Sequence, residues 1–179
     1  MQKLSVTEFL AQYANGKRNF GAIDLSETDL FEADLREINL SGSNLKKIYL
    51  PYANLSKANL QNVELSDAEL SDAKLYQVDL SNANLQGANL SRVNLRYAKL
   101  QGADFSGANL QGANLYRADL SAANLSGANL SRANLEGACL KQARLAGANF
   151  FKARMVNFSE AYLDRRTILP DGYPRDGAS

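Results

Sequence analysis

The sequence predicts an all-β solenoid built from short repeats that turn a corner once in every five residues. A large apolar residue occupies all 28 positions at five-residue intervals from Phe20 to Met155, and 24 of them are Leu. Two residues before each of these positions, Ala fills 19 places, and the residue between the two is Asn or Asp in 20 cases. Self-similarity at a short fixed period indicates stacked units that bury one continuous core.

A period of five excludes the regular straight structures. An α-helix repeats every 3.6 residues and a coiled coil every 3.5, so Leu residues five apart would spread around the helix. A flat strand has a period of 2, and an odd spacing would place alternate Leu residues on opposite faces. A chain that turns once per repeat fits the pattern, because Ala and Leu two residues apart then point to the same side of a very short strand.

The two remaining places of each repeat have the composition of turns. Gly occupies the second turn place at positions 42, 87, 102, 107, 112, 127, 137 and 147, where a type II turn requires positive φ. Asn62, Asp67, Asp72 and Asn82 take the same place and tolerate that conformation. Lys, Arg, Gln and Tyr elsewhere in this place predict a second type of turn. The Asn and Asp column before each Leu predicts side-chain hydrogen bonds to the backbone that hold the corners together.

The A-(N/D)-L-x-x repeat resembles the pentapeptide repeat family over roughly residues 18–163. This resemblance implies a right-handed quadrilateral β-helix with four repeats per coil and with the Ala and Leu places inward. The 28 repeats then give about seven coils, and a strand spacing of ~4.8 Å gives a rod roughly 35 Å long. The opening stretch and the ending from Thr167 to Gly172 also resemble bacterial members of this family.

Both ends of the predicted rod carry separate caps. Residues 1–17 form an N-terminal cap, in which a short amphipathic helix over 5–15 begins with a Ser5–Glu8 capping box and a Leu4–Phe9 hydrophobic staple. Its apolar residues recur at helical spacing, and Gly16 ends it; they are Val6, Phe9, Leu10 and Tyr13. The β-helix covers 18–163, although Phe158 and Leu163 resume the period three residues out of phase. Residues 164–179 form a C-terminal cap, with 175–179 loose. The apolar and Pro residues expected to fold over this open end are Ile168, Leu169, Pro170 and Pro174.

The composition argues against an enzyme, a membrane protein and a disulfide-rich protein. The 179 residues contain no His, so the commonest general base and metal ligand is missing, and the Leu and Ala core leaves no substrate cavity. We therefore expect no catalysis, cofactor or metal. Cys139 occupies an outward Asn/Asp place and should be partly exposed. No apolar run approaches the ~20 residues of a membrane span. Met1 to Tyr13 are too polar for the core of a signal peptide, which favours a cytoplasmic protein, and the resemblance described above implies a bacterial one.

Residues 20 apart should stack along the rod, so the exterior can be compared corner by corner. Two corners, in the turn pairs after Leu40 to Leu120 and after Leu65 to Leu125, consist almost entirely of Ser, Gln, Asn, Gly and Ala with an occasional Asp. A third gathers tyrosine and arginine side chains on one ridge, with Lys99 and Asp119 beside it. Tyr and Arg are enriched at the centres of protein interfaces, although exposed cation–π pairs can also merely decorate a repetitive surface. The candidate partner-binding residues are Tyr76, Arg96, Tyr97, Lys99, Tyr116 and Arg117.

A weaker aromatic candidate lies on the fourth corner, where either of its two Phe residues could instead pack against a terminal cap. Its members are Phe31, Tyr49, Pro51 and Tyr52, with Phe151 farther along the same column. Charge is also uneven along the rod: residues 21–80 hold 11 acids and 5 bases, and residues 81–155 hold 3 acids and 9 bases. Rods with opposite ends of opposite charge could associate, within a screening length of ~8 Å.

We interpret the chain as a non-catalytic protein-interaction or scaffold module, monomeric or weakly dimeric, whose partner is another protein. One alternative is DNA mimicry, because some members of the family protect topoisomerase as acidic dimeric rods, but a net charge of +1 departs from that pattern. A second is nucleic-acid binding by the basic half, which would be strongly salt-dependent; its candidates are Arg92, Arg96, Lys99, Arg117 and Arg132. A purely structural spacer is the third.

Overall fold

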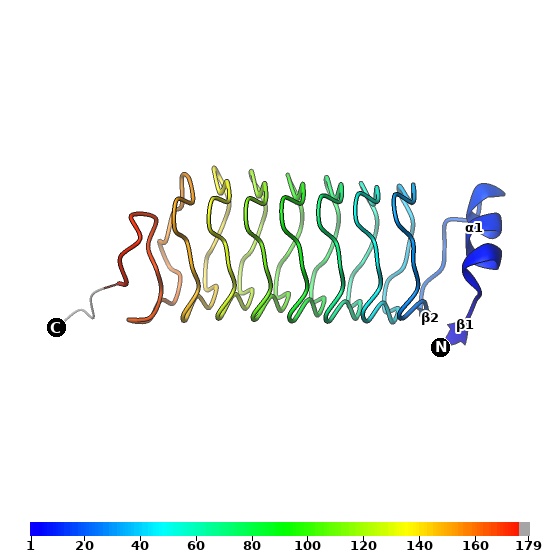
Figure 1. Ribbon diagram of the computed structural model, residues 1–179, viewed down its shortest axis with the longest axis horizontal. Helices are drawn as coiled ribbons and strands as arrows, with labels where there is room; N and C mark the ends of the chain where they lie inside the picture. Colours follow the sequence, from blue (N-terminus) through cyan, green and yellow to red (C-terminus); the bar gives the residue numbers. More distant parts are fainter. Residues whose placement is uncertain (176–179) are drawn as a thin grey trace.

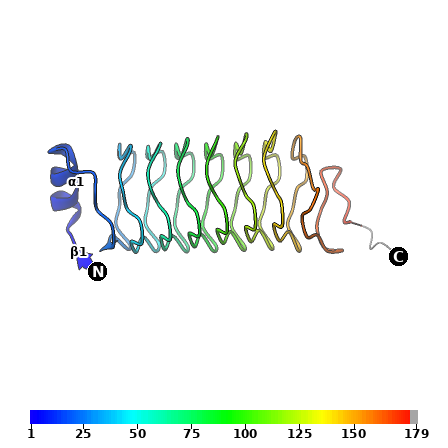
Figure 2. The ribbon, with the colours of Figure 1, turned by 180° about the vertical axis from the view of Figure 1, so that it is seen from behind.

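The computed structural model describes residues 1–175, most of which form a rod of stacked coils with the two termini at opposite ends (Figure 1). Parallel bridges join residues 20 apart in four ladders, which begin at Asn19, Asp24, Asp29 and Asp34. Because these ladders begin five residues apart, four pentapeptides complete each turn of the solenoid. The view from behind shows the same stack of coils (Figure 2).

Each rung of a ladder bridges a single residue, so strands of ordinary length are rare. Two segments in the described part of the chain are longer: β1 (Gln2–Lys3) and β2 (Ile23–Asp24), which pair in parallel. The sequence did not predict β1, since residues 2–3 lie outside the five-residue repeat. This strand continues one ladder beyond the first coil and ties the N-terminus to the rod.

All corners of the regular rod share one backbone conformation at the second turn place. From Ala22 to Lys152 this residue has a φ between 53° and 68° at all 27 turns, whether or not it is Gly. The predicted second turn type at Lys, Arg, Gln and Tyr is therefore wrong. At Gln77, for example, φ is 56° and the N–H donates to the Arg96 carbonyl of the next coil at 3.0 Å. Such hydrogen bonds between coils fix the backbone and outweigh the cost of the left-handed conformation for a residue other than Gly, which is about 1–2 kcal/mol.

This uniform turn predicts opposite effects of Gly at two neighbouring positions. Lys47 has a φ of 53°, so Lys47→Gly should stabilise the fold by about 0.5–1 kcal/mol, because relief of the left-handed conformation exceeds the entropy cost of Gly. Lys46, in the first turn place, has no such strain, and Lys46→Gly should destabilise by about 0.5–1 kcal/mol. Urea unfolding followed by circular dichroism measures both. Equal effects of the two substitutions would contradict the turn assignment.

The Asn/Asp column forms the predicted side-chain to backbone hydrogen bonds. Its side-chain oxygen accepts from the N–H two residues later, as Asn39 does from Ser41 at 3.0 Å. The amide group can also reach the preceding coil, where Asn109 Nδ2 donates to Asn89 Oδ1 at 3.2 Å. The column therefore holds each corner and also links neighbouring coils.

The Ala and Leu registers line the inside of the rod and form one continuous core. Ser43 replaces an inward Ala and is fully buried, but its hydroxyl accepts from the Ile23 N–H at 3.1 Å and donates to the Phe20 carbonyl at 3.3 Å. A polar residue inside this core thus keeps its hydrogen bonds, as burial requires. Met155 ends the five-residue register but is 70% exposed, so the expectation of an inward side chain is wrong there.

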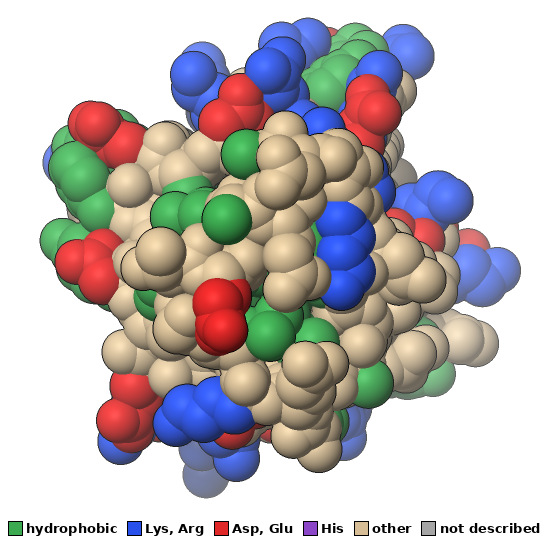
Figure 3. Space-filling view, turned by 90° about the vertical axis from the view of Figure 1, so that its right-hand side faces the viewer, with side chains coloured by type: hydrophobic (Ala, Val, Ile, Leu, Met, Phe, Trp, Pro, Cys, Tyr) green, Lys and Arg blue, Asp and Glu red, His purple; other side chains and the backbone are tan. Residues whose placement is uncertain are grey.

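The helix α1 (Val6–Ala14) covers the first coil and lies inside the predicted range 5–15. Its capping box is formed, because the Glu8 N–H donates to Ser5 Oγ at 3.2 Å and the Ser5 N–H donates to the Glu8 carboxylate at 3.1 Å. Phe9 is fully buried and packs edge-to-face on Phe20, with ring centroids 4.9 Å apart. Leu10, in contrast, is exposed. Seen from this end, charged side chains project from the rim of the rod (Figure 3).

The last coil is shorter than the others. Arg144 bridges Tyr162, 18 residues later, and Asn149 bridges Ile168, 19 residues later. The lost residues explain why Met155 turns outward and Phe158 takes up contact with the core, its ring 5.1 Å from that of Phe150. The predicted phase slip is therefore present. Ile168 pairs with Asn149 and so extends a ladder by one bridge. The sequence predicted only that Ile168 would fold over the open end of the rod.

A buried polar group holds the C-terminal segment on the rod. Thr167 is fully buried, and its hydroxyl donates to the Leu145 carbonyl at 2.9 Å. The Asp164 carboxylate accepts from the Gly147 N–H at 2.9 Å, a bond that favours the charged form and lowers the pKa of Asp164 to about 2. The Arg175 N–H donates to the Thr167 carbonyl at 2.8 Å, so the expectation of a loose tail is wrong at Arg175. The rest of that tail, 176–179, lies outside the described residues.

Candidate interaction surface

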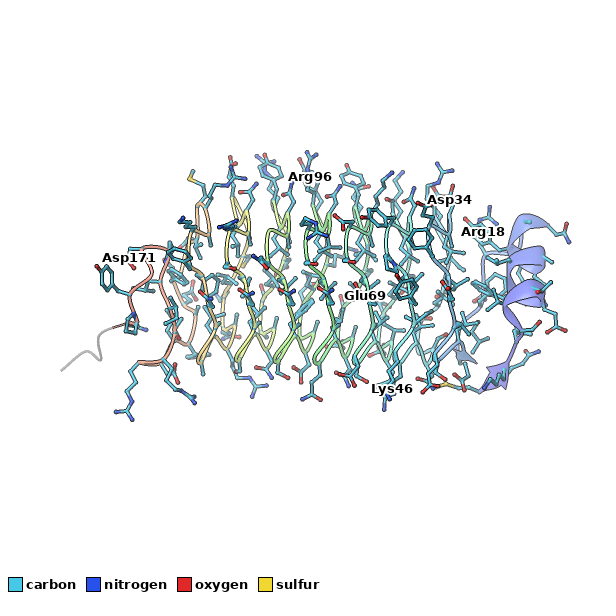
Figure 4. The ribbon with its side chains drawn as sticks, viewed as in Figure 1. Arg18, Asp34, Lys46, Glu69, Arg96 and Asp171 are labelled. Atoms are coloured by element: carbon cyan, nitrogen blue, oxygen red, sulfur yellow. The ribbon has the colours of Figure 1, made fainter. Side chains whose placement is uncertain are left out.

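The Tyr/Arg ridge consists of the side chains that leave three successive coils at the turns after Leu75, Leu95 and Leu115. Since the coils repeat every 20 residues, these turns stack, and the ridge lies along one edge of the rod. Figure 4 shows Arg96 on this edge and Lys46 on the opposite one. The members of the ridge are Tyr76, Arg96, Tyr97, Tyr116 and Arg117. The structure thus brings these five residues together, as predicted from the stacking of residues 20 apart.

The three tyrosine rings of the ridge form a continuous edge-to-face stack. Ring centroids are 5.8 Å apart between Tyr76 and Tyr97, and 5.5 Å apart between Tyr97 and Tyr116, with an angle of 83° between ring planes in both pairs. This geometry suits aromatic pairs, whose positive edge faces the negative face of the neighbouring ring. The alternation between first and second turn places allows it, because the central ring leaves its turn one residue later than the outer two.

Two arginines lie over these rings. The Arg96 guanidinium carbon is 5.9 Å from the Tyr97 centroid and 5.6 Å from the Tyr116 centroid, and that of Arg117 is 5.3 Å from the Tyr116 centroid. Both guanidinium groups are exposed, while the three rings are half-buried. The stack therefore presents cationic groups at its outer surface and restrains them with the aromatic rings beneath.

A shallow hollow of about 200 Å³ lies beside the ridge, between Arg96, Asn114, Tyr116 and Asn134. Its volume is below the ~300–1,000 Å³ of ordinary small-molecule sites. The hollow has room for a single side chain of a partner, and two amides, a phenol and a guanidinium are available there for hydrogen bonds. This arrangement suits recognition of a polar or acidic group.

Lys99 lies beside the ridge and outside the ring stack. It occupies a ladder place on the neighbouring side of the coil, and its Nζ is 3.8 Å from an Asp79 carboxylate oxygen. Asp119, the next rung of that ladder, accepts hydrogen bonds from Ser121 and Gln101. Since its charge is engaged by a neighbour on the same face, Lys99 contributes less to the ridge than Arg96 or Arg117.

The five basic residues considered for nucleic-acid binding do not form one strip. Arg92 and Arg132 lie on a different corner from Arg96 and Arg117, and Lys99 lies on a face between corners. Arg92 also donates two hydrogen bonds to the Asp72 carboxylate. A phosphate backbone that follows one edge would therefore meet only some of these charges, which weakens this alternative.

The second aromatic group is exposed at the N-terminal end of its corner. The Phe31 ring is 6.3 Å from that of Tyr49 and 5.9 Å from that of Tyr52, and all three rings are between 45% and 53% exposed. The expectation of a covering terminal cap is therefore wrong for Phe31. Pro51, on the same corner, is buried. Phe151, at the other end of the same corner, does pack against the C-terminal segment, at Gly172.

Other reactive groups are dispersed over the surface. Cys139 is exposed, as predicted, and its sulfur is 3.2 Å from the Ser121 hydroxyl. Within residues 1–175, no group of three or more His, Cys, Asp or Glu side chains could hold a metal ion. No helix in this range has the length and apolarity needed to cross a membrane, since α1 has nine residues.

The stacked coils, the filled interior and the patterned exterior together define a β-solenoid repeat protein. Pentapeptide-repeat models match this chain in 8 copies, which together cover residues 19–47 and 49–165. The chain therefore belongs to the pentapeptide repeat family. Among curated proteins, no significant match was found.

Several solved structures are similar to this chain. HetL, a pentapeptide repeat protein involved in heterocyst differentiation regulation from the cyanobacterium Nostoc sp. strain PCC 7120, is 31% identical, with 96% of this chain and 100% of HetL covered and a TM-score of 0.40. Rfr23 from the cyanobacterium Cyanothece 51142 is 28% identical, with 91% and 98% covered and a TM-score of 0.37. A trypsin-treated form of QnrB1, a plasmid-mediated fluoroquinolone resistance protein, is 17% identical, with 82% and 79% covered and a TM-score of 0.56.

Proposed function

We propose that this chain is a non-catalytic interaction module that binds another protein through the Tyr/Arg ridge. The observation that carries the proposal is the continuous stack of Tyr76, Tyr97 and Tyr116 with Arg96 and Arg117 over it. Tyr and Arg dominate the energetic centres of protein interfaces because they bury large area and still form directed polar contacts. We further propose about seven right-handed coils for the rod that carries this surface.

A rigid support strengthens this proposal. Each turn of the ridge is bonded to the next coil, as when the Tyr97 N–H donates to the Tyr116 carbonyl at 2.9 Å. The side chains are therefore held at fixed intervals before a partner arrives, which lowers the entropy cost of binding. Exposed guanidinium groups favour a partner surface that carries carboxylates, since Arg pairs with them in two parallel hydrogen bonds.

DNA mimicry receives less support from the distribution of charge. Mimicry of a duplex requires regularly spaced negative charge, whereas residues 81–155 carry 9 bases and 3 acids. A topoisomerase supercoiling assay at micromolar protein tests this alternative, and neither inhibition nor protection is expected.

A pair of matched triple variants tests the proposed function. Alanine at Tyr76, Arg96 and Tyr116 removes the outer parts of the ridge, and alanine at Gln86, Ser106 and Ser126 makes the same change on three successive coils of the opposite edge. Affinity purification from the native cell should recover a partner with the parent and the control variant but lose it, by tenfold or more, with the ridge variant. Circular dichroism checks that both variants fold.

A photo-crosslinking residue locates the contact directly. When placed at Tyr97 it should crosslink the same partner, and when placed at the exposed Gln86 on the opposite edge it should not. A partner that crosslinks equally from both positions, or that survives the ridge substitutions, would rule out the ridge as its binding surface.

A further inference from the structure

The corner that carries Phe31 differs from the ridge because its charges are separated along the rod. We call it the Phe31–Lys152 edge. It comprises the turn pair Phe31 and Glu32 and the pairs that follow at 20-residue intervals, up to Phe151 and Lys152. It also includes the ladder residue two places before each pair, such as Asp29. Its acidic residues all lie in the first three coils and are Asp29, Glu32, Glu69 and Asp72. Its basic residues all lie in the last four coils and are Arg92, Arg132 and Lys152.

Exposed aromatic rings accompany the acidic part of this edge. Phe31 and Tyr52 are 48% and 53% exposed, although their rings contact each other 5.9 Å apart. At the basic end, the Lys152 ammonium lies 5.0 Å from the Phe151 centroid. Apolar surface at both ends, with opposite charge beside it, is the composition of an interface with a polar rim.

We propose that this edge is the interface of an antiparallel homodimer. A two-fold axis through the Arg92 coil would place the first coil of one copy against the seventh coil of the other, and the second against the sixth. Both copies have the same 20-residue coil. When one coil of the first copy is aligned with a coil of the second, the other coils of the two copies are therefore aligned as well. Closed two-fold dimers are the commonest form of self-association because one patch then serves both partners.

The rungs that this axis brings together are complementary. Glu32 would lie opposite Lys152 of the second copy, Tyr52 opposite Arg132, and Phe31 opposite Phe151, with each contact formed twice. These are an ion pair, a cation–π pair and an aromatic pair. At the axis, each Arg92 already carries Asp72 as its counterion, with hydrogen bonds of 2.8 Å and 2.5 Å, so the two arginines meet as neutralised pairs.

A parallel arrangement of two copies along the same edge would be unfavourable. It would place Glu32 against Glu32 and Lys152 against Lys152, and like charges in contact repel. Asp171 lies at the C-terminal end of the rod (Figure 4). It follows Pro170, whose carbonyl accepts from the Lys152 N–H at 2.8 Å, and so lies beyond the seven paired coils. The Tyr/Arg ridge occupies the next corner of each coil, so this dimer neither needs the ridge nor covers it.

Sedimentation velocity between 1 and 200 μM protein tests the association. We expect a concentration-dependent shift from monomer to dimer in 50 mM NaCl and a dissociation constant at least tenfold higher in 500 mM NaCl, because contacts between charges at the surface are screened. Glu32→Lys and Lys152→Glu should each weaken the dimer about tenfold or more, while an equimolar mixture of the two variants should restore it. The matched control is Glu27→Lys, at the same turn place of the neighbouring corner. A monomer at every concentration, or equal effects of Glu32→Lys and Glu27→Lys, would overturn the proposal.

Cysteine crosslinking tests the orientation. In a Cys139→Ser background, which removes the native thiol, Ser71→Cys and Gln111→Cys should form disulfide-linked dimers only when the two variants are mixed, because residue 71 of one copy would face residue 111 of the other. Crosslinking of each variant with itself would indicate a parallel pair and overturn the antiparallel arrangement. Failure of these experiments leaves the ridge and its partner unaffected.

Discussion

Leu90→Asp is expected to lower the free energy of unfolding by about 3–5 kcal/mol, since it buries a carboxyl group with no partner. Leu90 lies in the middle of the rod, is fully buried, and belongs to the inward register shared with Leu70 and Leu110. The backbone cannot rotate the new side chain outward, because the Leu90 N–H is bonded to the Asn109 carbonyl at 2.7 Å. Protonation of the carboxyl would reduce the cost without supplying the missing hydrogen bonds.

Urea unfolding of the parent and the variant, followed by circular dichroism, measures this effect. Gln111→Asp introduces the same charge at an exposed first turn place one coil away, and it should change the free energy of unfolding by less than about 0.5 kcal/mol. A Leu90→Asp protein as stable as the parent would contradict an inward ladder of Leu side chains.

The core of this fold could be predicted from the sequence because one spacing controls it. Ala and Leu two residues apart, repeated every five, leave a single side of the chain for burial, and the structure places both registers inside. The turns could not be predicted as well. A Lys or Tyr in the second turn place avoids positive φ in isolation, and only bonds to the next coil, such as that from the Gln77 N–H to the Arg96 carbonyl, impose it.

Two features of the ends escaped prediction for a related reason. β1 has no repeat of its own, and its pairing with β2 depends on where α1 directs the chain. The outward turn of Met155 was also missed, because position 155 still fits the five-residue pattern and the predicted phase slip shows only from Phe158 onward, although the coil there has already lost residues. Both features depend on how the ends of the rod close rather than on the repeat.

The residues of the candidate ridge could be predicted from the sequence, but the geometry of their side chains could not. Stacking at 20 residues is enough to bring Tyr76, Arg96 and Tyr116 together. The edge-to-face angles and the engagement of Lys99 by Asp79 depend on side-chain rotamers, which the sequence pattern does not specify. The exposure of Phe31 has a different cause: it depends on how far α1 and the C-terminal segment extend over the rod, which the five-residue repeat does not specify.

A single Ala inserted after Leu100 is expected to unfold the C-terminal coils, because the free energy it costs exceeds the free energy that stabilises them. Every later residue would move forward by one place, so Asp104, Asn109 and Asn114 would take the inward positions of Phe105, Leu110 and Leu115. Each buried polar group without a partner costs about 1–3 kcal/mol, and lost burial of each large apolar side chain costs about 1.5–3 kcal/mol. Since whole proteins are stable by only about 5–15 kcal/mol, three such layers are enough to unfold this half of the rod.

The matched control is a larger insertion that keeps the phase. A second copy of residues 81–100 placed after Leu100 adds 20 residues, which is one full coil, and returns every following side chain to its own face. This longer protein should keep a cooperative thermal transition within about 5 °C of the parent, whereas the one-residue insertion should leave the chain after Leu100 open to limited proteolysis. The rod does lose residues within one coil near Met155, but there the last coil has no regular coil beyond it. At Leu100, regular coils lie on both sides and hold the register, so the rod cannot absorb the extra residue. A one-residue insertion that left the protein as stable as the parent would mean that neighbouring coils do not hold one another in register.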